Sequence, residues 1–166
     1  MKVIGPERYR LNFDANNFEV TCQKGSRTFS GIATSKKPKL YIVSAKGTPI
    51  YVGVTKQSIR NRLRNGWNAK GETGYYGYSW RHSLIEAQLD VWCHEDAPSD
   101  NSALDIETVE AEVVFLIRSA GQWPQFQTEI HFHPSNSNHR NVASTIVECY
   151  PGLRQTASDP SRRESS

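Results

Sequence analysis

The chain has 166 residues, of which 37% are hydrophobic and 22% are charged, and its formal net charge is +3. This length is enough for one domain with a core of its own and short for two domains. No apolar run is long enough to span a bilayer, and the first residues lack the apolar stretch of a signal peptide, so we expect a soluble, cytoplasmic protein. The small net charge does not by itself indicate a nucleic-acid partner.

Three cysteines, Cys22, Cys93 and Cys149, are widely spaced and form no CxxC pair. Disulfide frameworks and zinc sites usually require cysteines that are paired at short spacings. We therefore expect three reduced side chains that behave as small apolar residues.

The N-terminal residues 1–35 contain two short segments, 8–13 and 18–22, in which apolar and polar residues alternate. Alternation with a period of two is typical of strands, and the Asn and Gly residues between the segments indicate turns. We expect an N-terminal extension with one or two strands.

Two apolar segments, residues 40–43 and 50–52, flank a stretch of six residues that contains a glycine and a proline. Short apolar runs on either side of such a stretch predict a β-hairpin. Tyr41 and Tyr51 would then lie on neighbouring antiparallel strands.

The pattern becomes helical after Gly53, because Ile59 and Leu63 lie four residues apart on one helical face. Thr55 is the candidate N-cap and Gly66 the candidate C-terminal stop. The basic residues of this segment are Lys56, Arg60, Arg62 and Arg64, followed by Lys70. Two tyrosines beside a basic helix suit a polyanionic substrate whose chemistry needs both proton transfer and charge neutralisation.

The remaining segments show both strand and helix patterns. Residues 84–92 and 127–133 alternate as strands, whereas apolar residues recur at helical spacing from 102 to 121. We expect a short helix over residues 142–149. The tail, residues 155–166, is rich in Ser, Arg and Glu, and we expect it to be disordered.

Five sequence elements occur in an order that is characteristic of one enzyme family. They are the tripeptides Leu40-Tyr41-Ile42 and Tyr51-Val52-Gly53, the helical Arg62, the segment Glu110-Ala111-Glu112-Val113-Val114, and the pair Pro124 and Gln127. Together they resemble the GIY-YIG nuclease family over residues 39–127.

The resemblance implies an α/β fold in which helices flank a small, mostly antiparallel sheet. With the chain length, we expect a single domain over residues 1–154, in which an N-terminal strand extension and a C-terminal extension flank the core over 39–127. The resemblance also implies a metal-dependent endonuclease that hydrolyses DNA, of a restriction-like, mobile-element or repair type. By the same resemblance, Tyr41 would be the general base and Tyr51 would orient the attacking water or the phosphate. Arg62 would hold the scissile phosphate, and Glu110 would bind one Mg²⁺ or Mn²⁺ ion.

Two acidic residues could bind the metal, and the expected base, Tyr41, has an unfavourable pKa. Glu112 lies ~200° around the helix from Glu110, which shares the sheet-facing side with the valines, so we prefer Glu110 as the ligand. A phenol with a pKa of ~10 is a poor base at neutral pH. We therefore expect cations near Tyr41, namely Lys56 or Arg60, to lower its pKa.

Basic, aromatic and amide side chains around this core are candidates for nucleic-acid contacts. They are Lys56, Arg60, Arg64, Lys70, Tyr76, Tyr78 and Gln127. The aromatic residues among them belong to a loop, residues 75–80, that would either stack on bases or cap the core.

Three positions depart from the family pattern. Leu40 replaces a glycine, Gln127 replaces the usual asparagine, and Gly66 lies where a His or Tyr often follows the arginine by one helical turn. Residues 75–78 and His82 are candidates to replace that side chain. A non-catalytic nucleic-acid-binding protein on the same fold and an RNA nuclease therefore stay open as alternatives.

A separate group, Glu129, His131 and His133, would share one face of the strand expected over 127–133. This spacing occurs in some metal sites, but one strand offers no third imidazole. A second metal site and a structural or substrate-contacting role both remain open.

Overall fold

Five strands form one antiparallel sheet in the part of the chain that the computed structural model describes, residues 1–97, 99 and 101–153. Their spatial order is β2-β1-β5-β3-β4. The strands are β1 (Val3–Phe13), β2 (Phe18–Cys22), β3 (Lys39–Ala45), β4 (Thr48–Thr55) and β5 (Glu86–His94). The predicted tail over residues 155–166 lies outside the described residues.

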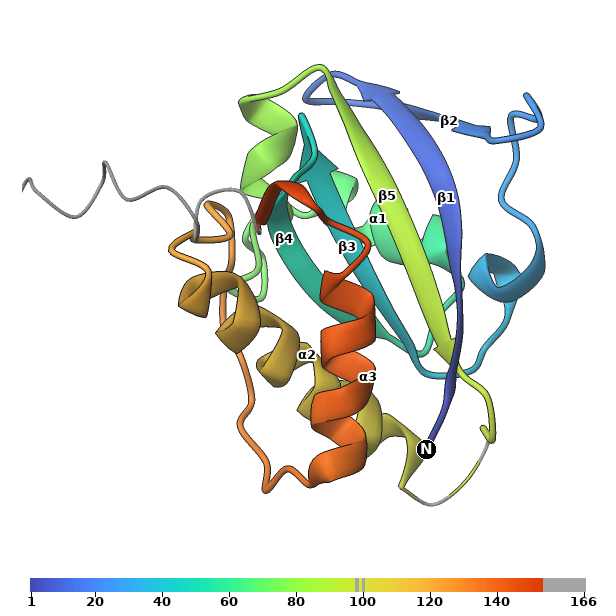
Figure 1. Ribbon diagram of the computed structural model, residues 1–166. Coiled ribbons are helices and arrows are strands. Elements are labelled where there is room, and N and C mark those ends of the chain that lie inside the picture. Colours follow the sequence, from blue (N-terminus) through green and yellow to red (C-terminus); the bar gives the residue numbers. More distant parts are fainter. Residues whose placement is uncertain (98, 100, 154–166) are drawn as a thin grey trace, which may run out of the picture.

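Helices cover both faces of this sheet (Figure 1). The helices α2 (Ser102–Ser119) and α3 (Ser137–Val147) lie on one face, and α1 (Ile59–Asn68) lies on the other. Two short 3₁₀ helices, η1 (Gly31–Thr34) and η2 (Ser79–His82), complete the layer that contains α1. The predicted α/β fold, a mostly antiparallel sheet flanked by helices, is confirmed.

The central strand β3 is buried on both faces, which explains its continuous apolar run. Tyr41 and Val43 point into the core under α1, while Leu40 and Ile42 point into the core under α2 and α3. All four side chains are fully buried.

The N-terminal segment forms both expected strands and joins the same sheet as the core. β1 pairs with β5 over most of its length and with β2 on its other side. The extension therefore widens the central sheet instead of forming a separate unit.

The β3–β4 hairpin has a shorter turn than the sequence predicts. Lys46 and Gly47 both have positive φ, 51° and 77°, which is the conformation of a two-residue hairpin turn. The strands extend to Ala45 and Thr48 on either side, and the register shifts next to Ser44.

The predicted boundaries of α1 are wrong at both ends. Its N-cap is Ser58, whose hydroxyl accepts a hydrogen bond from the Asn61 N–H, whereas Thr55 is the last residue of β4. Gly66 does not end the helix, which continues to Asn68. A glycine fits at this helical position because a Cβ here would collide with the ring of Tyr78.

The strand predicted over residues 127–133 is wrong, because this segment is irregular. The backbone groups of Val52 that would pair with it are occupied by the side-chain amide of Gln127. Phe132 is 78% exposed, so the alternation in the sequence has no buried face.

The last predicted helix forms, but it starts and ends earlier than residues 142–149. α3 begins after Asn136, which forms a capping box with His139. His139 and His94 also share the Asp105 carboxylate, at 2.8 and 3.1 Å. These contacts fix the start of α3 against β5 and α2.

None of the helices in the described ranges combines the length and the apolar character that crossing a bilayer requires. The three cysteines are free thiols, and Cys93 is buried.

Candidate active site

The rings of Tyr41 and Tyr51 meet at Gly53 on β4. Tyr41 lies directly opposite Gly53 in the β3–β4 pairing, and the two ring centroids are 5.9 Å apart. A Cβ at Gly53 would lie 2.6 Å from Cζ of Tyr41, 2.7 Å from its hydroxyl oxygen and 2.8 Å from Cε1 of Tyr51. The missing side chain therefore allows the Tyr41 ring to extend across β4.

We expect Gly53→Ala to displace both rings and to lower the free energy of unfolding by about 1–3 kcal/mol, the usual cost of overpacking. Urea unfolding measures the stability, with Gly152→Ala as the matched control. A Cβ at Gly152 meets its nearest atom only at 3.8 Å. Equal stability of the two variants would contradict this account of Gly53.

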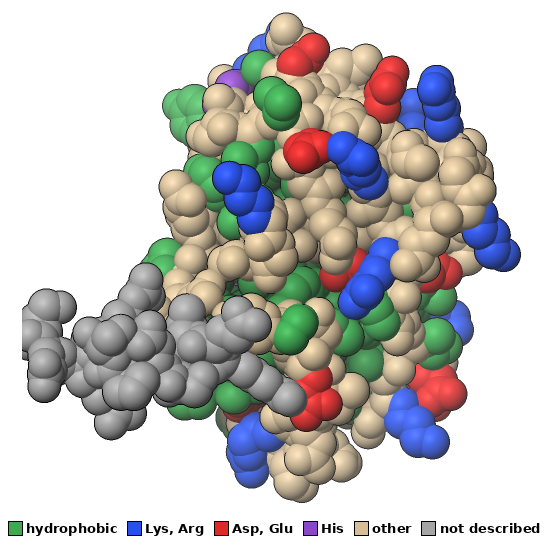
Figure 2. All heavy atoms as spheres, turned by 45° about the horizontal axis from the view of Figure 1, so that its top comes forward, with side chains coloured by type: hydrophobic (Ala, Val, Ile, Leu, Met, Phe, Trp, Pro, Cys, Tyr) green, Lys and Arg blue, Asp and Glu red, His purple; other side chains and the backbone are tan. Residues whose placement is uncertain are grey.

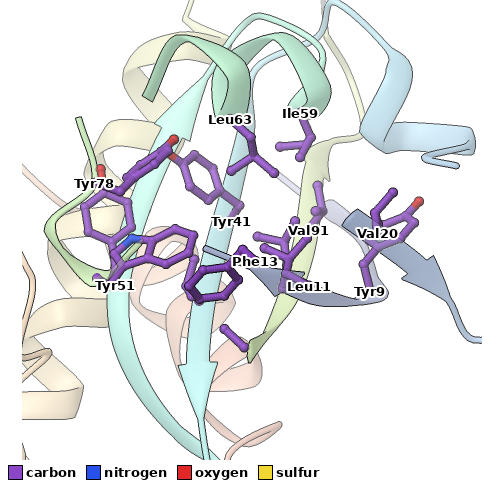
Figure 3. Packing of buried hydrophobic residues seen from close by; sticks show 14 of the residues in the cluster. Tyr9, Leu11, Phe13, Val20, Tyr41, Tyr51, Ile59, Leu63, Tyr78 and Val91 are labelled. Carbon is purple, nitrogen blue, oxygen red and sulfur yellow. The ribbon is translucent and has the colours of Figure 1, made fainter. Parts of the chain in front are cut away.

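The hydroxyl of Tyr41 is the centre of a buried polar cluster. It accepts a hydrogen bond from Nε of Arg62 at 3.2 Å and is hydrogen-bonded to the Tyr78 hydroxyl at 2.9 Å. The Arg62 guanidinium also lies over the rings of Tyr75 and Tyr78, at 5.5 and 5.7 Å from their centroids. Figure 3 shows Tyr41, Tyr51 and Tyr78 together at one end of the buried cluster.

The pKa of Tyr41 is raised well above its ordinary value, chiefly by burial and then by the neighbouring Tyr78 hydroxyl. Arg62 is the cation that opposes this rise. The expectation that Lys56 or Arg60 lowers the pKa of Tyr41 is therefore wrong. Ionisation of a phenol that is removed from water costs more than one neighbouring cation returns.

Glu110 lies on the buried side of α2, only 5% exposed, whereas Glu112 is partly exposed. This agrees with the helical phase that favoured Glu110. Burial, with repulsion from the Glu107 carboxylate, raises the pKa of Glu110 from 4.5 to about 8. The positive charge of Arg62 acts in the opposite direction, so the carboxylate and the guanidinium lie within electrostatic range of each other.

The Glu110 carboxylate fits a cation in its chemistry. Among the described residues no hydrogen bond reaches it, and its pKa is raised because burial and Glu107 disfavour the negative charge by more than Arg62 favours it. Mg²⁺ is commonly held by one or two carboxylates, with water and substrate phosphate as the other ligands. A group of three or more His, Cys, Asp or Glu ligands does not occur in the described ranges, so Glu110 would be the principal protein ligand.

The raised pKa of Glu110 predicts how stability depends on pH. The folded protein keeps this proton up to about pH 8, whereas the unfolded chain loses it near 4.5. Stability should therefore fall as pH rises through this window. We expect Glu110→Gln to remove that fall and to be the more stable protein at pH 9 in EDTA, by a few kcal/mol. Urea unfolding at pH 5 and pH 9 measures the difference, and parallel pH profiles for both proteins would contradict it.

The other residues predicted to contact nucleic acid differ in their exposure. Tyr78 is 3% exposed and belongs to the buried cluster, so of the two roles expected for the loop of residues 75–80 it has the core-capping one. Lys56, Arg64, Lys70 and Tyr76 are exposed, Tyr76 by 72%. Arg60 lies over the Phe29 ring, at 5.4 Å from its centroid.

Gln127 has a structural contact where the sequence predicted a nucleic-acid contact. Its amide accepts a hydrogen bond from the Val52 N–H at 2.8 Å and donates one to the Val52 carbonyl at 2.9 Å. Phe126 N–H donates to the Ile50 carbonyl next to it. This segment therefore closes the free edge of β4.

The Glu129, His131 and His133 group does not form a cluster. Glu129 and His131 are exposed, and His133 pairs with Glu107 on α2 at 2.8 Å. The contact with Glu107 supports a structural role for His133.

On the face shown in Figure 2, Lys and Arg side chains lie among Asp and Glu side chains. A hollow of about 730 Å³ lies between β1, β2, β5 and the β3–β4 turn, and its lining does not include Tyr41, Tyr51 or Tyr78. Its two arginines, Arg8 and Arg10, are paired with Asp90 and Glu86.

Comparison of the chain with models of protein families, with curated proteins and with solved structures found no match. The geometry of the site is therefore the basis for any functional assignment.

Proposed function

We propose that this protein is a metal-dependent endonuclease of the GIY-YIG type that hydrolyses phosphodiester bonds in DNA. The observation that supports this most strongly is the arrangement around Arg62, which is hydrogen-bonded to Tyr41 beside Tyr51 and whose charge acts on Glu110. These side chains come from β3, β4, α1 and α2, and the pKa values of Tyr41, Tyr51 and Glu110 all respond to the charge of Arg62.

Each side chain has one role in the proposed reaction. Arg62 uses Nε to hold Tyr41, and the described residues offer no hydrogen-bond partner to its two terminal nitrogens. These nitrogens can bind the scissile phosphate and stabilise the charge that builds up on it. Tyr41 accepts the proton of the attacking water, and Tyr51 beside it orients the water or the phosphate. Glu110 would hold the divalent ion, which supplies Lewis-acid stabilisation when bound.

Incubation of supercoiled plasmid with the protein tests the proposal directly. We expect nicking with Mg²⁺ or Mn²⁺ and none with EDTA. Retention of the plasmid on a gel without nicking would instead favour a non-catalytic nucleic-acid-binding protein. A parallel incubation with RNA distinguishes an RNA nuclease, because cleavage of RNA alone would reassign the substrate.

Arg62 and Arg64 provide a matched pair on one helix. We expect Arg62→Ala to lower the cleavage rate by at least about 10²-fold, the usual loss for one preorganised electrostatic contact. Arg64 is exposed, so Arg64→Ala should chiefly weaken DNA binding and reduce its dependence on salt. Single-turnover rates and binding at several salt concentrations measure the two effects. If both variants bind DNA equally weakly and cleave at unchanged rates, α1 contributes only to binding and Arg62 has no catalytic role.

A further inference from the structure

The ring of Tyr78 occupies the space that a side chain at position 66 would need. A Cβ built on Gly66 would overlap with Cε2 and Cδ2 of Tyr78. Tyr78 is 3% exposed and also packs edge-on against the rings of Trp67 and Tyr51. A residue from the loop before η2 thus fills a position on the inner face of α1.

Arg81 fixes this loop to the end of α1. Its guanidinium donates hydrogen bonds to the carbonyl oxygens of Gly66, Trp67 and Ala69, at the C-terminal end of the helix. A buried cation that binds the last carbonyls of a helix is favourable, because these groups lack partners within the helix. Tyr78 is therefore held in place from both sides, by its ring packing and by Arg81.

The hydrogen bonds of Tyr41 identify where its proton can go. Arg62 donates to the Tyr41 oxygen and cannot accept a proton in return. The Tyr41 and Tyr78 oxygens lie 2.9 Å apart, and either hydroxyl can donate this hydrogen bond. When Tyr41 donates, the Tyr78 oxygen is the acceptor that its proton reaches within the described part of the chain.

We propose that Tyr78 is a positioning residue that takes up the proton of Tyr41 while Tyr41 removes a proton from the attacking water. This inference rests on the proposed function. As the water oxygen bonds to phosphorus, its proton moves to Tyr41, the Tyr41 proton moves to Tyr78, and the Tyr78 proton passes to solvent water. The ester bond to the leaving oxygen breaks, and that oxygen takes up a proton from solvent.

The relay solves a physical difficulty of this site. A phenolate at either position would be poorly solvated, because Tyr41 is fully buried and Tyr78 is only 3% exposed. A hydroxyl that gains one proton as it loses another stays neutral throughout. Tyr41 can therefore act as a base without first becoming an anion.

The experiment compares Tyr78→Phe with Tyr75→Phe and with the unmodified protein, in single-turnover plasmid nicking with Mg²⁺ in mixtures of H₂O and D₂O. Phenylalanine keeps the ring against Gly66, so the fold should persist. Tyr75 is the matched control, because its ring also lies over Arg62 but its hydroxyl has no hydrogen bond within the described residues. For Tyr78→Phe we expect a loss of at least about tenfold. The rate of the unmodified protein should curve with deuterium content, and that of Tyr78→Phe should be linear.

The outcomes separate this inference from the proposed function. If the unmodified protein nicks DNA and Tyr78→Phe matches it in rate and isotope dependence, the relay is refuted and the nuclease proposal stands. If the unmodified protein does not nick with Mg²⁺ or Mn²⁺, both are refuted. Incorporation of 3,5-difluorotyrosine at position 78 restores a hydroxyl of lower pKa. Recovery of the rate with a shifted pH profile would support the relay, whereas failure to recover would contradict it.

Discussion

Glu110→Gln is expected to lower metal-dependent cleavage by about 10³-fold or more, because a metal-held charge stabiliser contributes several kcal/mol to the transition state. Glutamine keeps the volume of the side chain, so no cavity forms next to the buried valines of α2. DNA binding should change only a few-fold. The same variant should be more stable than the unmodified protein at high pH, because it no longer has to bury the ionised Glu110 carboxylate. A loss of cleavage together with a gain in stability would exclude unfolding as the cause.

Glu112→Gln is the matched control on the same helix. Glu112 is partly exposed on a different side of α2, so its replacement should leave cleavage within a few-fold. If Glu110→Gln cleaves normally and Glu112→Gln does not, the metal ligand is Glu112 and the assignment to Glu110 is wrong.

Tyr41→Phe is expected to lower the cleavage rate by about 10²–10⁴-fold with DNA binding intact, the usual range for loss of a general base. The change removes one oxygen and keeps a ring that is fully buried in the core. Tyr9→Phe is the matched control, because Tyr9 is another buried tyrosine. Its hydroxyl is hydrogen-bonded to Glu7 on β1 and to Ser30, which precedes η1. Its replacement should have little effect on cleavage. A near-normal rate for Tyr41→Phe would remove Tyr41 from the mechanism.

The pH dependence of cleavage should follow Glu110 and not Tyr41. The pKa of Tyr41 lies well above its ordinary value, so its ionisation does not change in the neutral range. Ionisation of this phenol therefore does not drive a rise in cleavage over that range. The pKa of Glu110, about 8, predicts a rise up to that pH when the metal is limiting.

The parts of the site that follow from short-range rules were predictable from the sequence. Tyr41 and Tyr51 lie on paired strands because the hairpin follows from two apolar runs and one turn. Glu110 is buried because helical phase places it beside the apolar face of α2.

The parts that depend on contacts distant in the sequence were not predictable. The sequence left residues 75–78 and His82 as candidates to replace a side chain at Gly66. It did not select Tyr78, since this contact depends on how Arg81 folds the loop back onto α1. The strand expected over residues 127–133 failed for a similar reason. Alternation indicates a strand only where a partner edge is free, and Gln127 already occupies that edge.

The side-chain amide of Gln127 has a consequence for association between copies of the protein. β4 is an edge strand, and free backbone groups at an edge allow another chain to extend the sheet and aggregate. Gln127 satisfies the Val52 N–H and carbonyl, and Phe126 satisfies the Ile50 carbonyl. A neighbouring molecule therefore finds no unpaired backbone at these positions, so this part of β4 does not offer an edge on which another chain can extend the sheet.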